Sequence, residues 1–141
     1  MIKHYSPFVE VGTPQIVLVD HEQRFVDKTA AALTVEGFSC RGYTSIEAAA
    51  AAVRVRRPDL LLIAINVPGT SGTEISRRVR SDRDLANVPI IFMSATQIPD
   101  IIHRWDDGHG SYCVRTALDI GVLVELMEKM LPTAAVSQAA Y

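Results

Sequence analysis

Residues 58–72 read Pro58-Asp59-Leu60-Leu61-Leu62-Ile63-Ala64-Ile65-Asn66-Val67-Pro68-Gly69-Thr70-Ser71-Gly72 and carry the clearest structural signal in the chain. The five apolar residues from Leu60 to Ala64 follow Pro-Asp and precede a loop rich in Pro and Gly, which is typical of a short strand buried on both faces. Ser71 and Glu74 have the spacing of a capping box, which predicts a helix directly after the loop. Because ligands of open parallel sheets bind outside the carboxyl ends of the strands, the loop after Ala64 has the natural position for a functional site.

Composition indicates one globular domain. The chain has 141 residues, of which 48% are hydrophobic and 21% charged. Its net charge of −2 and pI near 6 predict no general attraction to nucleic acid or to anionic lipid. No stretch approaches the length of about 18 apolar residues that a membrane span needs. Lys3 and His4 are not followed by the apolar run of a signal peptide, so we expect none. Cys40 and Cys113 lack metal-ligand spacing and are expected to be reduced core residues. We therefore expect a cytoplasmic protein without a membrane segment or a direct nucleic-acid partner.

Hydrophobic periodicity divides the chain into three parts. Residues 1–14 lack any period and are interpreted as an N-terminal extension, residues 15–131 as the domain, and residues 132–141 as a tail or the start of a linker. Short apolar or β-branched runs predict strands, at 15–19, 38–43, 60–64, 88–93 and 112–114. Amphipathic stripes and capping boxes, among them Thr44-Ser45-Ile46-Glu47, predict helices, at 23–36, 44–56, 73–81, 99–105 and 120–131.

The predicted strands and helices alternate five times with short connections. Right-handed crossovers then require a five-stranded parallel sheet with helices on both faces, which is a doubly wound, three-layer α/β/α domain. All strands of such a sheet end at the same edge. Seven residues are thereby expected to meet there: Asp20, His21, Ala64, Asn66, Ser94, Ala95 and Arg115.

These residues resemble the receiver domain of two-component signalling, a flavodoxin-like (βα)5 module that accepts a phosphoryl group on an aspartate. The most specific similarity is residues 58–72, where the family reads Pro-Asp-Leu, three apolar residues, Asp, an apolar residue, Asn, Met, Pro, Gly, two further residues and Gly. Ser94-Ala95 matches the Thr/Ser-Ala pair after the fourth strand, and Tyr112 falls at the family's aromatic switch position. The similarity extends over residues 15–131, nearly the whole chain.

The resemblance also implies that the phosphoryl-accepting chemistry has been lost. Ala64 occupies the position of the phosphoacceptor Asp, and a methyl group is neither a nucleophile nor a metal ligand. Asp20 and His21 stand where the family has two acids, and Arg115 stands where it has Lys. Because Mg²⁺ takes oxygen ligands in an octahedral set, only Asp20 and the carbonyl of Asn66 stay as weak candidate ligands. We expect a degenerate receiver, or pseudo-receiver, that is not an enzyme, has no catalytic residue and binds Mg²⁺ weakly or not at all.

The charges of this edge are expected to balance without a metal. Asp20 opposite Arg115 is neutral as a pair, and a protonated His21 would add a positive charge. We expect an ion pair between Asp20 and Arg115 where the family has its metal. Ser94 either keeps the family's hydroxyl group at this edge or simply ends a strand.

A candidate interaction face lies in the C-terminal third of the chain. Receivers commonly use the surface of the fourth helix, fifth strand and fifth helix for dimers and output, and this surface corresponds here to Ile101, Ile102, Trp105, Tyr112 and Val114. The resemblance implies a protein partner, a fused output domain or a homodimer through this surface. Packing beside the predicted helix at 99–105 is the alternative role of these side chains.

Two functional classes stay open. In the first, which we favour, the chain is a pseudo-receiver of a phosphorelay that protein partners recognise without phosphorylation. In the second, it is a working phosphoryl-accepting switch that uses Asp20 or Ser71, or whose natural sequence has Asp at position 64. A flavodoxin-like cofactor binder is disfavoured, because the loop Asp20-His21-Glu22-Gln23 lacks the Ser, Thr and Gly that surround a flavin phosphate.

Overall fold

The computed structural model describes residues 12–64, 72–83, 85–94, 102–105, 111–115 and 120–131, and the side chains of all of these except 72–76, 102–105 and 111–115. The described residues form, in chain order, β1 (Gln15–Val19), α2 (Gln23–Val35), β2 (Ser39–Tyr43), α3 (Ile46–Val55), β3 (Leu60–Ala64), α4 (Gly72–Ser81), β4 (Ile90–Ser94), β5 (Ile102–Trp105), β6 (Ser111–Arg115) and α5 (Ile120–Met130).

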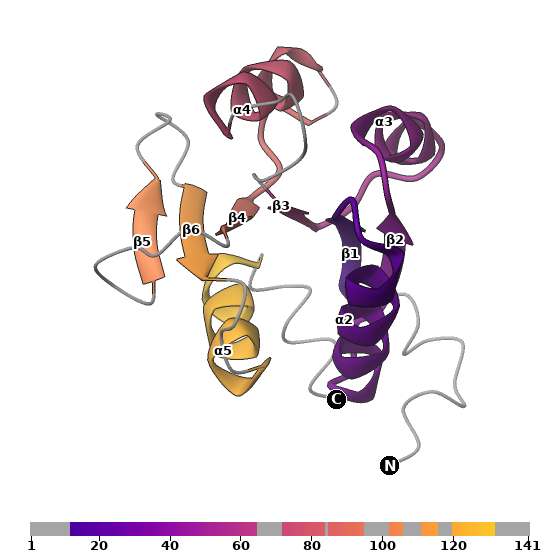
Figure 1. Ribbon diagram of the computed structural model, residues 1–141, viewed down its shortest axis with the longest axis vertical. Helices are drawn as coiled ribbons and strands as arrows, with labels where there is room; N and C mark the ends of the chain where they lie inside the picture. Colours follow the sequence, from indigo (N-terminus) through magenta and orange to yellow (C-terminus); the bar gives the residue numbers. More distant parts are fainter. Residues whose placement is uncertain are drawn as a thin grey trace.

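The strands form one sheet in the order β2-β1-β3-β4-β6-β5. The first five strands of this order are parallel, and β5 pairs antiparallel with β6 at the edge. Helices α2 and α5 cover one face of the sheet, and α3 and α4 cover the other (Figure 1). The doubly wound, three-layer α/β fold predicted from the alternation of strands and helices is therefore confirmed.

One predicted helix is wrong, because part of it forms strand β5. The segment 99–105 was expected to be a short helix, but Ile102–Trp105 is a strand. Its register with β6 places Ile102 opposite Val114 and Trp105 opposite Ser111. Ile and Trp favour strands, and a short apolar segment does not distinguish a helix from a strand by its periodicity. Pairing with β6 decides the conformation, so the sheet gains a sixth, antiparallel strand.

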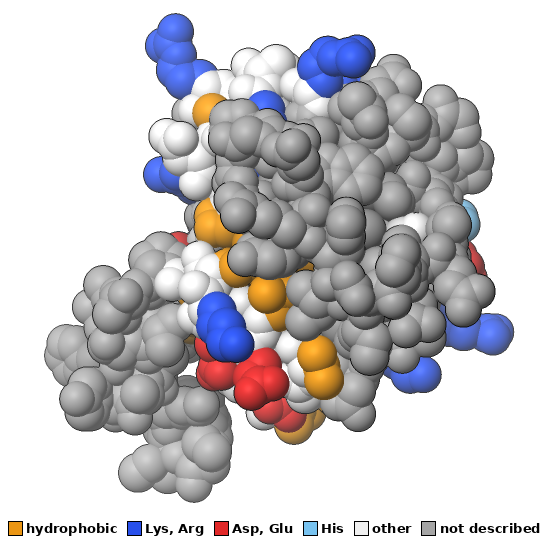
Figure 2. All heavy atoms as spheres, turned by 90° about the vertical axis from the view of Figure 1, so that its left-hand side faces the viewer, with side chains coloured by type: hydrophobic (Ala, Val, Ile, Leu, Met, Phe, Trp, Pro, Cys, Tyr) orange, Lys and Arg blue, Asp and Glu red, His pale blue; other side chains and the backbone are white. Residues whose placement is uncertain are grey.

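Charged residues are unevenly distributed over the fold. Eight of the chain's 14 Lys and Arg residues lie between positions 41 and 83, in the region of β2, α3 and α4, whereas only five of its 16 acidic residues lie between positions 39 and 88. Figure 2 shows Lys and Arg side chains standing out at the upper end of the molecule, where α4 lies in Figure 1. The α3 and α4 side of the sheet is therefore more basic than the chain as a whole.

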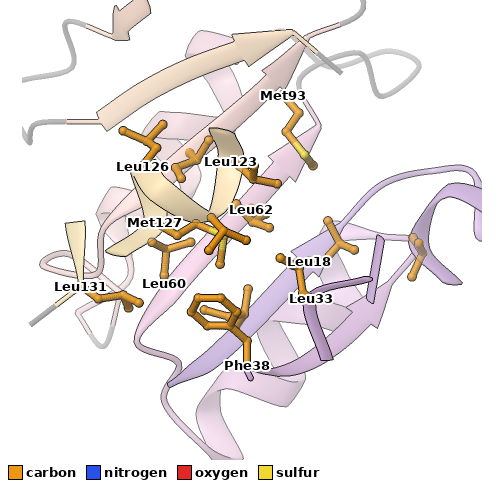
Figure 3. Close-up of a cluster of buried hydrophobic side chains, with 14 residues drawn as sticks. Leu18, Leu33, Phe38, Leu60, Leu62, Met93, Leu123, Leu126, Met127 and Leu131 are labelled. Carbon is orange, nitrogen blue, oxygen red and sulfur yellow. The ribbon is translucent and has the colours of Figure 1, made fainter. Parts of the chain in front are cut away.

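The hydrophobic core has two parts, one on each face of the sheet. On one face, side chains of β1, β3 and β4 meet α2 and α5, as Figure 3 shows for Leu18, Leu62, Met93, Leu33 and Met127. On the other face, neighbouring strand positions pack with α3 and α4 in a second cluster of eleven buried residues. The central strands β3 and β4 are buried along their whole length, as their continuous apolar sequences predicted.

Local features explain where the helices begin and end. Helix α2 ends before Gly37, whose φ of 100° suits glycine far better than other residues. Helix α3 is capped by Ser45, whose Oγ accepts a hydrogen bond of 3.1 Å from the backbone N–H of Ala48. The capping box predicted from Thr44 to Glu47 is thus shifted by one residue, and Glu47 has another partner, described below.

The Pro-Asp pair before β3 has a structural role. The backbone N–H of Asp59 donates to the carbonyl of Gln15 at 2.7 Å, and its Oδ2 accepts from the backbone N–H of Gln15, also at 2.7 Å. These two hydrogen bonds join the beginnings of β1 and β3. Asp59 therefore aligns the neighbouring strands β1 and β3, which end at the candidate site.

Candidate functional site

The strand ends bring the predicted residues to one edge of the sheet. Register pairs Val19 with Ile63, so that Asp20 and Ala64 follow as neighbours. Ser94 ends β4 and lies opposite Arg115, the last residue of β6. The topology therefore places Asp20, Ala64, Ser94 and Arg115 at the carboxyl edge, as expected.

Asp20 is held firmly by its own loop. It is 5% exposed, and its Oδ1 accepts a hydrogen bond of 2.9 Å from the backbone N–H of Glu22. The same Oδ1 lies 3.5 Å from Nδ1 of His21, whose side chain is 39% exposed. The backbone N–H of Asp20 donates to the carbonyl of Tyr43 and so fixes the loop to the end of β2. One carboxylate oxygen of Asp20 thus already serves to shape the turn before α2.

Ala64 and Ser94 complete the described part of this edge. Ala64 is 3% exposed and presents a methyl group as its only side-chain atom. Ser94 is 1% exposed and provides a hydroxyl group at the end of β4. The described side chains at the ends of β3 and β4 therefore provide no carboxylate.

Several predicted site residues lie outside what the structure describes. Asn66, Ala95 and Ile101 fall outside the described residues. Arg115 and four members of the candidate interaction face are placed by their backbone alone, and these four are Ile102, Trp105, Tyr112 and Val114. The ion pair between Asp20 and Arg115 and the interaction face therefore stay predictions.

The described residues of this edge offer few oxygen ligands for a magnesium ion. Mg²⁺ requires a near-ideal octahedron of oxygen ligands, whereas the residues after β1 offer one partly engaged carboxylate, the imidazole of His21 and the exposed Glu22. Across the described parts of the chain, no three His, Cys, Asp or Glu residues are grouped so that they could hold a metal ion. Within the same residues, none of the helices is long and apolar enough to cross a membrane.

The described cysteine carries no reactive thiolate. Cys40 lies in the edge strand β2, and burial raises the pKa of its thiol to about 11. A thiol with so high a pKa stays protonated at neutral pH and is a poor nucleophile and metal ligand. The expectation that Cys40 is a reduced residue packed against the core agrees with its place beside the α2 and α5 cluster.

Sequence reasoning missed a hollow between α3 and α4. A cavity of about 320 Å³ lies there, with a floor formed by Val19, Leu61 and Ile63 of the sheet. Arg78 of α4 forms an ion pair of 3.1 Å with Glu47 of α3 beside it. The only signal in the sequence is the spacing of Ile46, Ala49, Ala50 and Val53, which predicts a buried face of a helix. The spacing does not show that the small alanine side chains leave part of this face uncovered.

The fold and the residues at the strand ends define a receiver-type α/β domain, and comparison with known proteins shows the family. The model of the response regulator receiver domain matches residues 16–127. This chain therefore belongs to the response regulator receiver family.

Individual relatives agree with this assignment. The phosphate regulon transcriptional regulatory protein PhoB of Pseudomonas aeruginosa is 36% identical over 80 residues, which are 57% of this chain and 35% of that protein. The DNA-binding response regulator MtrA of Mycolicibacterium smegmatis is 29% identical over 102 residues, 72% of this chain and 43% of that protein. The chain thus spans less than half the length of these curated relatives.

Solved structures show the same fold. A CheY-like receiver domain from Methylobacillus flagellatus superposes with a TM-score of 0.70 at 18% identity, covering 84% of this chain and 98% of its own. The response regulator TrrA, crystallised in complex with the histidine kinase ThkA, gives a TM-score of 0.71 at 23% identity, covering 85% of this chain and all of its own.

Proposed function

We propose that this chain is a receiver that transmits its signal by protein–protein contact, without a phosphoryl group on residue 64. One observation carries the proposal: β3 ends at the carboxyl edge in Ala64, which is buried and has only a methyl group. In the receiver family, this is the position of the phosphoacceptor aspartate. A methyl group cannot attack phosphorus, so the ordinary covalent step has no nucleophile here.

The remaining residues of the edge support the loss of the metal-dependent step. Asp20 has one oxygen engaged by the Glu22 N–H, and His21 supplies nitrogen where the family has a second acid. Arg115 replaces the family's Lys at the end of β6. A site with fewer carboxylates needs less cationic charge, so Asp20 and Arg115 balance without Mg²⁺. On this proposal the chain has no enzymatic activity and no cofactor.

The partner on this proposal is another protein. PhoB is named as a transcriptional regulatory protein, MtrA as a DNA-binding response regulator, and TrrA was crystallised with a histidine kinase. By analogy, this chain binds a signalling kinase, an output domain or a second copy of itself. The candidate surface is the edge of β5 and β6 with α5, and the work is done in the cytoplasm without direct contact with nucleic acid or membrane.

The proposal is tested by incubating the protein with acetyl phosphate and Mg²⁺ and following its intact mass, together with amide NMR spectra during addition of beryllofluoride. We expect no phosphoryl adduct and no shifts at Asp20 or Ser94. The matched comparison is the triple variant Ala64→Asp, His21→Asp, Arg115→Lys, which restores the family residues and should acquire the adduct. A phosphoryl adduct on the unaltered chain, for example on Asp20, would contradict the proposal and favour the phosphoryl-accepting alternative.

A further inference from the structure

The cavity between α3 and α4 has the features of a small-molecule site. Its volume of about 320 Å³ lies at the lower end of the range of about 300–1,000 Å³ that is usual for ligand pockets. Ile46 and Arg54, at the two ends of its α3 wall, are eight residues apart, which corresponds to a length of about 12 Å along the helix. The cavity therefore extends along α3, but only over a short distance. It lies on the opposite side of β3 and β4 from α5, away from the candidate interaction face at the sheet edge.

The floor and walls of this cavity are apolar. Leu61 and Ile63 of β3 are at most 2% exposed, and Ala49, Val53 and Leu85 are at most 6% exposed. These side chains come from the sheet, from α3 and from the turn after α4, so the apolar lining is continuous across three elements. An apolar chain that enters the cavity would gain about 25 cal/mol for each Å² of apolar surface removed from water.

The rim adds positive charge to the apolar lining. Arg54 and Arg78 both line the cavity and are exposed. Arg78 is already paired with Glu47, whose pKa is lowered by a hydrogen bond from its own backbone and then by Arg78. The guanidinium group of Arg54 forms no hydrogen bond or ion pair with any described residue. Asp82 also lines the cavity, and this residue interacts with another group of the protein. Arg54 is therefore the group on the rim that can pair with a negative charge.

The small volume of the cavity and the ion pair beside it exclude a bulky occupant. The 3.1 Å ion pair between Glu47 and Arg78 ties the start of α3 to α4. A partner helix is about 10–12 Å wide with its side chains, and it would have to break this ion pair and separate the two helices to reach the floor. A slender ligand does not have to separate the helices, because it can lie along α3 next to the ion pair.

From this combination we propose that the cavity between α3 and α4 binds a small amphipathic carboxylate, with its apolar chain over Leu61, Ile63 and Val53 and its carboxylate at Arg54. This site is separate from the strand edge that carries the proposed function, and it does not depend on whether residue 64 or any other residue is phosphorylated. Binding would connect α3 with α4 more firmly than the surface ion pair alone does.

The test is a titration of the intact chain with octanoate, followed by amide and methyl NMR and by calorimetry, with octylammonium and 1-octanol as probes of equal chain length. We expect saturable shifts at Val53, Leu61 and Leu85 with octanoate, and affinity at least about ten-fold higher for octanoate than for octylammonium, because only the carboxylate can pair with Arg54. Equal affinity for the two ions, or no saturable shift at the cavity residues, would overturn the proposal.

Two variants make the test specific. Arg54→Gln removes the charged end of the site and should weaken octanoate binding about ten-fold, whereas the matched control Arg56→Gln, just beyond α3 and not on the lining, should leave it unchanged. Ala50→Leu fills the cavity from a half-buried helical position and should abolish binding. If both Arg54→Gln and Ala50→Leu fold and bind octanoate as the unaltered chain does, the site is not this cavity and the proposal fails.

Discussion

Arg80 acts as a clamp at the end of α4. Its Nη1 donates hydrogen bonds to the carbonyls of Leu85, Ala86 and Val88, at 3.2, 3.0 and 2.7 Å. These three carbonyls belong to the connection between α4 and β4, where backbone groups have no partners in a helix or a sheet. The charged side chain therefore replaces secondary structure as the partner of this turn.

Replacing Arg80 by Met should lower the free energy of unfolding by about 1–3 kcal/mol, because the three carbonyls lose a charged donor while the apolar part of the side chain is kept. Urea denaturation measures the change. The matched control is Arg77→Met on the same helix, an exposed position where we expect a change within about 0.5 kcal/mol. Equal effects of the two substitutions would show that the hydrogen bonds to the turn contribute little.

For single residues, the sequence predicted where a side chain lies in the fold better than it predicted the hydrogen-bond partners of that side chain. Asp20, Ala64 and Ser94 were expected at the strand ends because parallel strands end at one edge, and the register places them there. The hydrogen bond from the Glu22 N–H to Asp20 was not predicted, because its donor is a backbone group, although Asp often accepts in this way from the residue two positions further on. The clamp by Arg80 was missed for the same reason, because its acceptors are backbone groups, which every sequence has.

Among the elements, the close approach of α2 to β2 depends on Gly42. A Cβ atom at this position would overlap with Cγ1 of Val26, a buried residue of α2. Gly42 lies in the short strand Ser39–Tyr43, where a glycine is otherwise unfavourable and often marks a close approach of another element.

Gly42→Ala should lower the free energy of unfolding by about 1–3 kcal/mol, because the added methyl group forces α2 away from the sheet. Val26→Ala alone should also destabilise, since it removes buried apolar atoms. In the double variant the new methyl group has room. The loss of unfolding free energy in the double variant should therefore be clearly smaller than the sum of the losses in the two single variants. Chemical denaturation of the four proteins measures this coupling, and strictly additive effects would mean that the helix and strand do not meet as described.

The elements that the sequence predicted well were those with long or continuous patterns. The strands at β1, β3 and β4 and the helices α2 and α5 were all expected near their observed bounds. Two shorter features were wrong. The helix expected at 99–105 contains the strand Ile102–Trp105, and Ser45 rather than Thr44 caps α3. Both depend on what a few residues contact in the folded chain, and local sequence contains little of that information.

For the molecule as a whole, the two hydrophobic clusters define the folding unit. Every buried residue of both clusters lies between Ile16 and Leu131. The first cluster joins β1 near the start of this range to α5 at its end, so the packing of the sheet depends on both. The predicted domain, residues 15–131, therefore contains the whole described core.

A chain reduced to residues 12–132 should unfold in one cooperative transition, with a free energy of unfolding within about 0.5 kcal/mol of that of the 141-residue chain. Differential scanning calorimetry and urea denaturation measure this. The matched control is a chain that ends at residue 125, which loses the buried Leu126, Met127 and Leu131 and should not fold stably. If the chain of residues 12–132 were markedly less stable, the domain would extend beyond the predicted bounds.

The strand order also has a consequence for how the protein is made. Of the described strands, β1 is the first to leave the ribosome, yet it lies inside the sheet, between β2 and β3. Its buried sequence Ile16-Val17-Leu18-Val19 must wait for a partner on both sides, and the second partner is complete only at Ala64. At synthesis rates of about 5–20 residues per second, this apolar strand has unpaired edges for several seconds. During that interval the nascent chain exposes an apolar strand with unpaired edges, which is a species that chaperones protect from aggregation.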